Sequence, residues 1–334
     1  MNAQYEESER GDMLRINGTE ERIGWDGKSH TWAWIEHEHQ ERWKKDIETQ
    51  LLKCYSRARR PDRQAFWKWC LDNAGDWLIA KPEELAKVVQ KVKNDYAELL
   101  SANNKKIRNE VRDIFGYKHS KLLYLANWLN VKTCPYCNMH YTIYVDGHTR
   151  KAKMAKFQFD HFYDKAEYPM LSMSLYNLIP SCASCNQGKS KGELDLDFNP
   201  YHAAIKDAFY FRVAKPLPLW KGSDSEVSDI EMVAKDEEKL KKFNDMFHVD
   251  KLYQHHKDVV RETFTRVYAE RYYSCKENFK FLKDRELARR IQEGGYPEEA
   301  DIDKRPLTKL QIDMRKQAEG IDWDDVFYED EKDV

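Results

Sequence analysis

Apolar residues between positions 82 and 100 recur every three or four residues. The positions concerned are Leu85, Val88, Val89, Val92, Tyr96, Leu99 and Leu100. This spacing places them on one side of a helix, with Pro82 at its first turn. Similar patterns predict helices at about residues 32–58, 62–79, 103–115, 119–129 and 251–280. The pattern therefore predicts a mainly helical protein.

The hydrophobic period shortens between residues 139 and 160. Apolar residues alternate with polar ones at 141–145 and at 157–159, and Asp146-Gly147 lies between the two runs. Alternation predicts half-buried strands and Asp-Gly favours a tight turn, so we expect a β-hairpin here. The run 186–192 ends in glycine and predicts a short helix. Two strands followed by a helix form a compact ββα unit, and the predicted fold class is α+β.

Composition allows a folded chain without a membrane segment. The 334 residues are 41% hydrophobic and 34% charged, which suffices for one large or two modest cores. The longest apolar runs are a few residues, whereas a spanning helix needs about 20. The first ten residues lack the basic and apolar regions of a secretory signal. We therefore expect a cytoplasmic protein with no membrane partner.

Charge is balanced over the whole chain but not in its middle. The 56 basic and 58 acidic residues give a net charge of −2, so no overall positive field indicates a nucleic-acid partner. Residues 132–192, in contrast, hold eight basic and four acidic side chains. This local surplus is compatible with contact to nucleic acid.

Four of the seven cysteines form two C-x-x-C pairs, Cys134/Cys137 and Cys182/Cys185. Each pair puts two thiolates on one tight turn, and two such turns give the tetrahedral sulfur cage that structural zinc prefers. A cytosolic chain is not expected to use them as a disulfide framework. The two pairs therefore predict a zinc site.

Cys134-Pro135-Tyr136-Cys137 is also similar to the active-site turn of dithiol glutaredoxins, where a helix N-terminus lowers a thiol pKa. That fold requires an earlier strand and a cis-proline loop, and it gives no role to the second cysteine pair. We therefore favour zinc over redox chemistry.

Between and just after the cysteine pairs lie Asp160-His161, Asn177 and Asn186. Hydrolysis of a phosphodiester requires a water nucleophile, a base and a hard cation that neutralises developing charge. A histidine can be the base because its pKa lies near neutral pH. Oxygen atoms of Asp160 and Asn186 would suit magnesium or manganese.

The order of these residues resembles the HNH nuclease family, which has the ββα-metal fold and includes a form with four zinc-binding cysteines. The resemblance is carried by two strings, 159–165 (Phe-Asp-His-Phe-Tyr-Asp-Lys) and 176–189 (Tyr-Asn-Leu-Ile-Pro-Ser-Cys-Ala-Ser-Cys-Asn-Gln-Gly-Lys). It covers about residues 132–201. It implies a mainly helical protein around a small zinc-braced ββα-metal nuclease core.

The resemblance implies a role for each matched residue. His161 would be the general base, and Asn177 would hold the histidine loop. Asp160 and Asn186 would bind the catalytic divalent metal, Mg²⁺ or Mn²⁺, and Lys189 would lie near the phosphate. Asn186 stands where the family name has its last histidine. Cys134, Cys137, Cys182 and Cys185 would bind structural Zn²⁺.

The start at Cys134, Tyr168-Pro169 and Asn199-Pro200-Tyr201 further resemble bacterial HNH proteins of phage-defence operons, such as the nuclease subunit of Septu systems, which works with an ATPase. This closer resemblance implies anti-phage defence, DNA as substrate and an ATPase partner. We expect five segments: a flexible arm (1–30), an N-terminal helical region (31–130), the nuclease core (131–202), a C-terminal mainly helical region (203–320) and an acidic tail (321–334).

Two alternatives remain open from the residues themselves. The cysteine pairs and the local positive charge also suit a zinc-stabilised nucleic-acid-binding module without catalysis. A nuclease of this type could also cut RNA, because the residues recognise a phosphodiester and do not identify the sugar.

Overall fold

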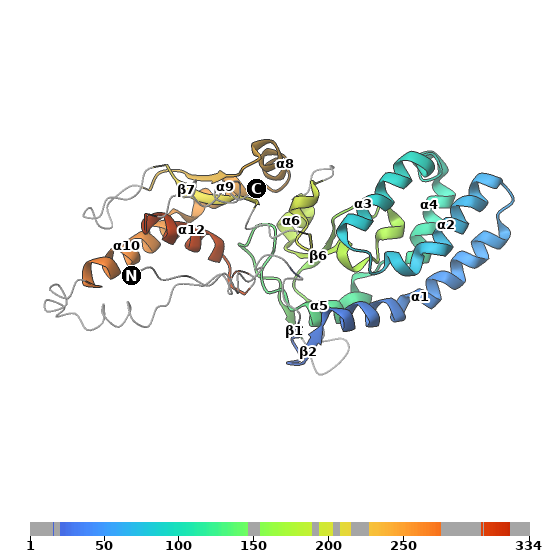
Figure 1. Cartoon of the computed structure of the whole chain (residues 1–334), viewed down its shortest axis with the longest axis horizontal. Helices are drawn as coiled ribbons and strands as arrows, with labels where there is room; N and C mark the ends of the chain where they lie inside the picture. Colours follow the sequence, from blue (N-terminus) through green and yellow to red (C-terminus); the bar gives the residue numbers. More distant parts are fainter. Residues whose placement is uncertain are drawn as a thin grey trace, which may run out of the picture.

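The described part of the chain is mainly helical and contains four small antiparallel strand pairs (Figure 1). The computed structural model describes residues 16, 21–145, 154–188, 194–202, 208–214, 227–274, 302 and 304–320. The α-helices are α1 (Trp32–Arg57), α2 (Pro61–Trp77), α3 (Pro82–Lys91), α4 (Lys105–Phe115), α5 (Leu123–Leu129), α6 (Ala183–Gly188), α8 (Glu237–Phe247), α9 (Val249–Tyr253), α10 (Lys257–Ser274) and α12 (Thr308–Ala318). The strand pairs are β1 (Glu21–Ile23) with β2 (Ser29–Thr31), β3 (Tyr144–Val145) with β4 (Met154–Ala155), β5 (Gln158–His161) with β6 (Leu178–Ser181), and β7 (Tyr210–Val213) with β8 (Ile230–Val233). This agrees with the predicted α+β class.

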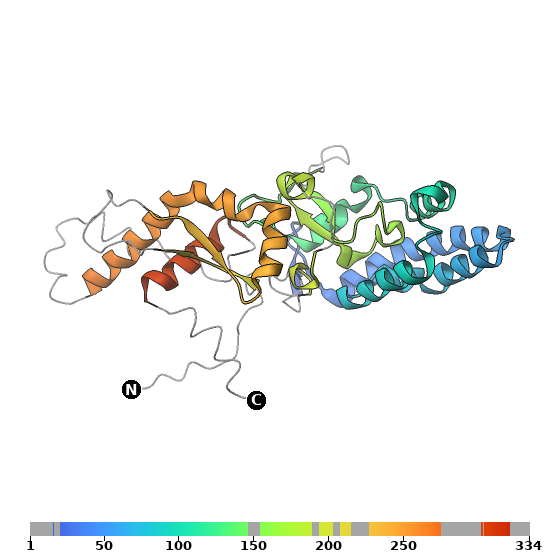
Figure 2. The same ribbon diagram turned by 90° about the horizontal axis from the view of Figure 1, so that it is seen from above.

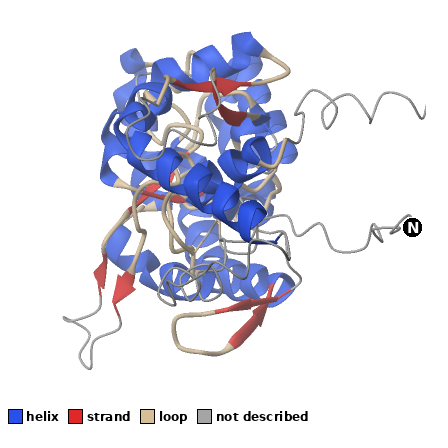
Figure 3. Cartoon of the chain, turned by 90° about the vertical axis from the view of Figure 1, so that its left-hand side faces the viewer, coloured by secondary structure: helices blue, strands red, loops and turns tan. Residues whose placement is uncertain are grey.

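The N-terminal helices lie at one end of an elongated molecule, and the C-terminal helices lie at the other (Figures 1 and 2). Strand β6 and helix α6 lie between these ends. Figure 3 shows how little of the chain is strand compared with helix. The short strand pair β5–β6 therefore lies in the middle of a helical protein.

The helices predicted before residue 130 are present at close to the predicted bounds. Helix α1 is capped by Thr31, whose hydroxyl oxygen accepts from the backbone N–H of Trp34 at 3.2 Å. Its buried face packs against α2, which begins at Pro61. The helix predicted across 82–100 differs, because α3 ends at Lys91 and a π-helical turn, η1 (Val92–Tyr96), follows.

Residues 21–30 belong to the segment that we expected as a flexible arm (1–30). Strands β1 and β2 pair as a hairpin that contacts α5. The backbone N–H of Trp25 donates to the carbonyl oxygen of Asn127 at 3.0 Å, and the backbone N–H of Asp26 donates to the Asn127 side chain, also at 3.0 Å. These hydrogen bonds hold the segment against α5, and the Trp25 side chain packs against the core. Residues 1–15 and 17–20 lie outside the described ranges.

The strands of the middle region pair differently from the prediction. The expected hairpin of residues 141–159 is reduced to β3 and β4, and its Asp146-Gly147 turn lies outside the described residues. Phe159 belongs instead to β5, which pairs with β6, and Phe159 lies opposite Pro180. Strand β6 is buried at every position, so it has no alternation that a sequence pattern could detect. Pro180 fits there because β6 pairs with β5 alone among the strands that the structure describes.

A strand–strand–helix unit is present, but it is built from β5, β6 and α6. Helix α6 packs against β5 and begins at Ala183, between the cysteines of the second pair. The helix predicted at 186–192 thus starts three residues earlier, and residues 189–193 lie outside the described ranges.

Additional short helical turns connect these elements. They are η2 (Ala102–Asn104), η3 (His119–Leu122), η4 (Pro169–Leu171), η5 (Leu175–Asn177), η6 (Leu196–Phe198) and η8 (Gln254–His256).

The C-terminal region combines helices with the β7–β8 pair. Strand β7 precedes β8 along the chain, and the helix predicted at 251–280 corresponds to α9, η8 and α10 up to Ser274. Strand β8 was not predicted. Helix α12 packs against β7 and α10, and the carboxylate of Asp313 accepts from the backbone N–H of Phe211 at 2.8 Å. The predicted acidic tail at 321–334 lies outside the described residues.

Across the ranges given above, no helix combines the length and apolar character needed to cross a bilayer.

Candidate metal centre and active site

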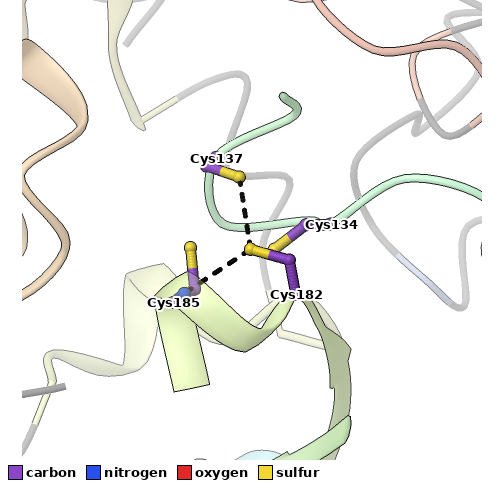
Figure 4. A group of neighbouring side chains, drawn as sticks. All are labelled: Cys134, Cys137, Cys182 and Cys185. Carbon is purple, nitrogen blue, oxygen red and sulfur yellow. Dashed lines mark hydrogen bonds between the residues drawn. The ribbon is translucent and has the colours of Figure 1, made fainter. Parts of the chain in front are cut away.

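The four paired cysteines come together in one buried cluster (Figure 4). Their sulfur atoms all lie within 4.8 Å of one another, and all four side chains are buried. The Sγ atoms of Cys137 and Cys182, one from each pair, are 3.8 Å apart. Four thiolates about 2.3 Å from a zinc ion are separated by about 3.8 Å in a regular tetrahedron. The cluster can therefore hold a metal ion such as zinc.

Backbone N–H groups also point at the sulfur atoms. Met139 donates to Cys137 Sγ and Cys185 donates to Cys182 Sγ, both at 3.5 Å. Hydrogen bonds from the neighbouring thiols lower the pKa of Cys182, whereas burial raises the pKa of Cys134. Four buried thiols cannot all ionise without a compensating cation. A bound divalent cation would compensate the negative charge of the four thiolates.

The surroundings of Cys134 differ from those of a redox thiol. Residues 135–137 form a turn, and Cys134 is buried, not exposed at the start of a helix. The sulfur atoms of the second cysteine pair lie within 4.8 Å of the Cys134 sulfur atom. A low-pKa thiol that attacks a disulfide needs access to solvent and a positive environment, such as a helix N-terminus, that stabilises the thiolate. This geometry supports metal binding.

Asn138 fixes the first cysteine turn to the C-terminal region. It has a positive φ of 49°, as asparagine tolerates. Its side-chain amide donates to the carbonyl oxygen of Ile302 at 2.6 Å, and its side-chain oxygen accepts from the backbone N–H of Lys309 at 3.1 Å. Tyr253 donates to the carbonyl oxygen of Cys137 at 2.7 Å. The metal turn is therefore held by residues more than 100 positions away along the chain.

Asp160 is joined to the cysteine cluster through Tyr136. The Tyr136 hydroxyl donates to Asp160 Oδ2 at 2.9 Å, and both side chains are buried. Burial, followed by the charge of Asp160, raises the pKa of Tyr136 well above its usual value, so this hydroxyl keeps its proton. A hydrogen bond from a protonated phenol stabilises an ionised carboxylate. The contact with Tyr136 therefore fixes the orientation of the Asp160 carboxylate.

His161, the last residue of β5, is held by a backbone carbonyl. Its Nε2 atom lies 3.1 Å from the carbonyl oxygen of Ser172. A carbonyl oxygen only accepts hydrogen bonds, so Nε2 must carry the proton. In the neutral ring, Nδ1 then carries the lone pair. This tautomer is the one that a general base acting through Nδ1 requires.

Tyr117 lies beside both Asp160 and His161. Its ring packs edge to face against the His161 ring, with centroids 4.4 Å apart. Burial and then the charge of Asp160 raise the pKa of Tyr117 to about 12. Tyr117 interacts with both side chains at the end of β5.

Asn177 supports the loop that follows His161. It is fully buried, and its side-chain oxygen accepts from the backbone N–H of Tyr163 at 2.7 Å. Its amide donates to the carbonyl oxygens of Leu171 at 2.9 Å and Tyr163 at 3.1 Å. All three partners lie in the segment that surrounds the histidine. Asn177 therefore ties the segment after His161 to the turn that precedes β6.

Asn186 on α6 is linked to β5 through Gln158. Its side-chain amide donates to the side-chain oxygen of Gln158. Gln158 precedes Asp160 by two residues in β5, so both side chains point to the same face of the strand. The bond uses the Asn186 nitrogen and leaves its oxygen as the atom suited to a metal. Asn186 and Asp160 are thus associated with one face of β5, as a shared metal site would require.

Lys189, expected near the phosphate, lies outside the described residues. Sequence reasoning missed Gln158, Tyr136, Ser172 and Tyr117. Gln158 could have been found from its two-residue spacing to Asp160, and Tyr136 from its place between two cysteines. Ser172 acts through its backbone and Tyr117 precedes the motif by more than 40 residues, so neither has a sequence signal.

Comparison of this chain with protein-family models, with curated proteins and with solved structures gave no match. Functional inference therefore rests on the residues of the chain and their geometry.

Proposed function

We propose that this chain is a metal-dependent endonuclease of the HNH type that hydrolyses phosphodiester bonds of DNA. The observation that carries the proposal is the bond between His161 Nε2 and the Ser172 carbonyl, at the end of a strand whose Asp160 is held by the cysteine turn. A buried histidine that is fixed in one tautomer is suited to act as a general base. The buried carboxylate that precedes it in the chain is suited to bind a metal ion that stabilises developing charge.

In the proposed reaction, His161 Nδ1 removes a proton from the attacking water as oxygen approaches phosphorus. The bond between phosphorus and the leaving oxygen breaks, and a proton from solvent restores the leaving hydroxyl. A divalent metal ion bound by Asp160 and Asn186 would neutralise charge on the phosphate and the leaving oxygen. Asn177 keeps the histidine segment in place. The four cysteines would hold structural zinc, and Tyr136 would connect that site to Asp160.

Nicking of a supercoiled plasmid with Mg²⁺ or Mn²⁺ tests this function. His161→Ala is expected to slow nicking by about 10²–10⁴-fold, the usual contribution of a general base. His37→Ala is the matched control because His37 is an exposed histidine on α1. A His161→Ala variant that nicks as fast as the parent protein would overturn the mechanism. A parent protein that binds DNA without cutting it under any divalent metal would favour a zinc-stabilised binding module.

The ATPase partner and the role in anti-phage defence implied by the closer resemblance are part of this proposal. They predict that an ATPase encoded beside this chain copurifies with it and changes its nicking rate. An RNA substrate of equal length, run in the same assay, distinguishes a DNA nuclease from an RNA nuclease.

A further inference from the structure

Helix α4 carries a row of cations on its exposed side. Lys105, Arg108 and Arg112 follow one another at intervals of three and four residues, which places them on one side of the helix. Ile107 and Val111 are buried on the other side. The apolar side holds α4 in the protein, so the cationic side has a fixed position.

These three cations and Lys165 line a single cavity of about 420 Å³ between α4 and the loop that follows His161. The other lining residues are uncharged. Helix α4 packs against η4, and Arg108 donates to the carbonyl oxygen of Ala166. The loop and the helix therefore form one surface.

The cations of this cavity are not neutralised by nearby acids. Arg112 donates to the side-chain oxygen of Asn109, and within the described part of the chain none of the four is ion-paired with a carboxylate. A second cavity, of about 480 Å³ on α3, is different, because its Lys91 is paired with its Asp95 at 2.7 Å. The α4 cavity thus carries a positive charge that can attract an external anion.

The cavity lies next to the candidate active site. The ammonium group of Lys165 is 4.5 Å from the centroid of the Tyr117 ring. The same ring packs against His161, with centroids 4.4 Å apart. One aromatic ring therefore separates a cation of the cavity from the proposed general base.

We propose that the α4 cavity, defined by Lys105, Arg108, Arg112 and Lys165, binds the backbone phosphates of DNA next to the bond that His161 attacks. The proposal rests on the proposed function, because it takes His161 to mark the cleaved bond. Arginine suits this role since its planar guanidinium group can donate two parallel hydrogen bonds to a phosphate. Phosphate contacts of this kind position a duplex without reading its sequence.

The proposal is tested by fluorescence anisotropy, which measures binding to a labelled duplex DNA of about 24 base pairs. EDTA is added to prevent cutting, and each measurement is completed within minutes of its addition. Lys105→Glu/Arg112→Glu is expected to weaken binding by about tenfold or more and to lower the slope of log affinity against log salt by about 2. Lys105→Gln/Arg112→Gln should give an intermediate loss. Lys87→Glu/Lys91→Glu makes the same charge change in the α3 cavity and should bind within about twofold of the parent protein. Thermal melting of each variant confirms that it is folded.

The outcomes separate this proposal from the proposed function. If the α4 variants bind DNA like the parent protein while His161→Ala abolishes nicking, the cavity proposal is overturned and the nuclease stands. If the α4 variants lose DNA binding but the parent protein never cuts, the cavity is supported as a DNA site and the nuclease fails. Equal losses in the α4 and α3 variants overturn the cavity proposal, because they indicate an effect of net charge alone. If the α4 variants lose binding to duplex RNA but not to duplex DNA, the cavity proposal is also overturned.

Discussion

The hydroxyl group of Tyr136 donates a hydrogen bond to the carboxylate of Asp160 at 2.9 Å. Tyr136 lies between Cys134 and Cys137, so the turn that presents two sulfur atoms also holds the carboxylate proposed to bind the catalytic metal. Tyr136 stacks on Phe247 with ring centroids 4.5 Å apart, which fixes its orientation from the C-terminal region. The proposed structural metal site and the proposed active site are therefore coupled through one side chain.

Tyr136→Phe removes this hydrogen bond and keeps the ring. Loss of a partner that orients a metal ligand typically weakens metal affinity 10–100-fold, so the Mg²⁺ concentration for half-maximal nicking should rise by about tenfold or more. Zinc content should stay the same. Tyr141→Phe is the control because Tyr141 is 53% exposed. An unchanged Mg²⁺ requirement in Tyr136→Phe would exclude this role for the hydroxyl group.

Metal content tests the cysteine cluster directly. We expect about one zinc ion per chain by atomic emission, as a four-cysteine site binds one ion. Cys182→Ser should lose this zinc and unfold at a lower temperature, because binding energy at such a site is also folding energy. Cys54→Ser is the control, since Cys54 is a half-buried cysteine outside the cluster. Zinc that remains in Cys182→Ser at the parental amount would refute the assignment.

Local patterns predicted the helices well because their burial is one-sided. The helices α1, α2, α4 and α5 lie close to the expected ranges because an apolar stripe at helical spacing is a local signal. Strand β6 was missed because all its residues are buried, and a run buried on both faces shows no alternation of apolar and polar positions. The hairpin at residues 21–31 was missed because hydrogen bonds to the distant α5 hold it.

The candidate site was predictable where chemistry is encoded in spacing. The two C-x-x-C pairs predicted a cluster, and the cluster is present. The tautomer of His161 was not predictable, because it depends on the backbone carbonyl of Ser172. The α4 cavity was also missed, since it brings Lys105 and Lys165 together across 60 residues of chain. Such features arise only from tertiary packing.

Asn177 should contribute strongly to stability as well as to activity. Asn177→Ala would remove three buried hydrogen bonds, two to Tyr163 and one to the carbonyl oxygen of Leu171, at an expected cost of about 3 kcal/mol in the free energy of unfolding. Urea denaturation measures this cost. Nicking should also slow at a temperature where the variant is fully folded, because the His161 segment loses its support. Asn94→Ala, at an exposed position, should change neither quantity. A stable Asn177→Ala variant with parental nicking would show that the loop holds itself in place.

His39 should make the fold sensitive to acid. It is fully buried in α1, where Nε2 donates to the carbonyl oxygen of Met173 at 2.7 Å and Nδ1 accepts from the Tyr124 hydroxyl at 2.8 Å. Burial lowers the pKa of His39 from 6.5 to about 4. Between these values the unfolded chain binds a proton that the folded chain does not, so this stability is complete above pH 6.5 and falls as pH decreases toward 4. The expected loss from pH 7.5 to pH 5 is about 2 kcal/mol, measured by urea denaturation at the two pH values. His39→Gln should remove about this much of the pH dependence of the free energy of unfolding. His37→Gln is the control, because His37 is exposed on the same helix, and it should leave the pH dependence unchanged. An identical pH dependence in the parent protein and in His39→Gln would show that other groups cause it.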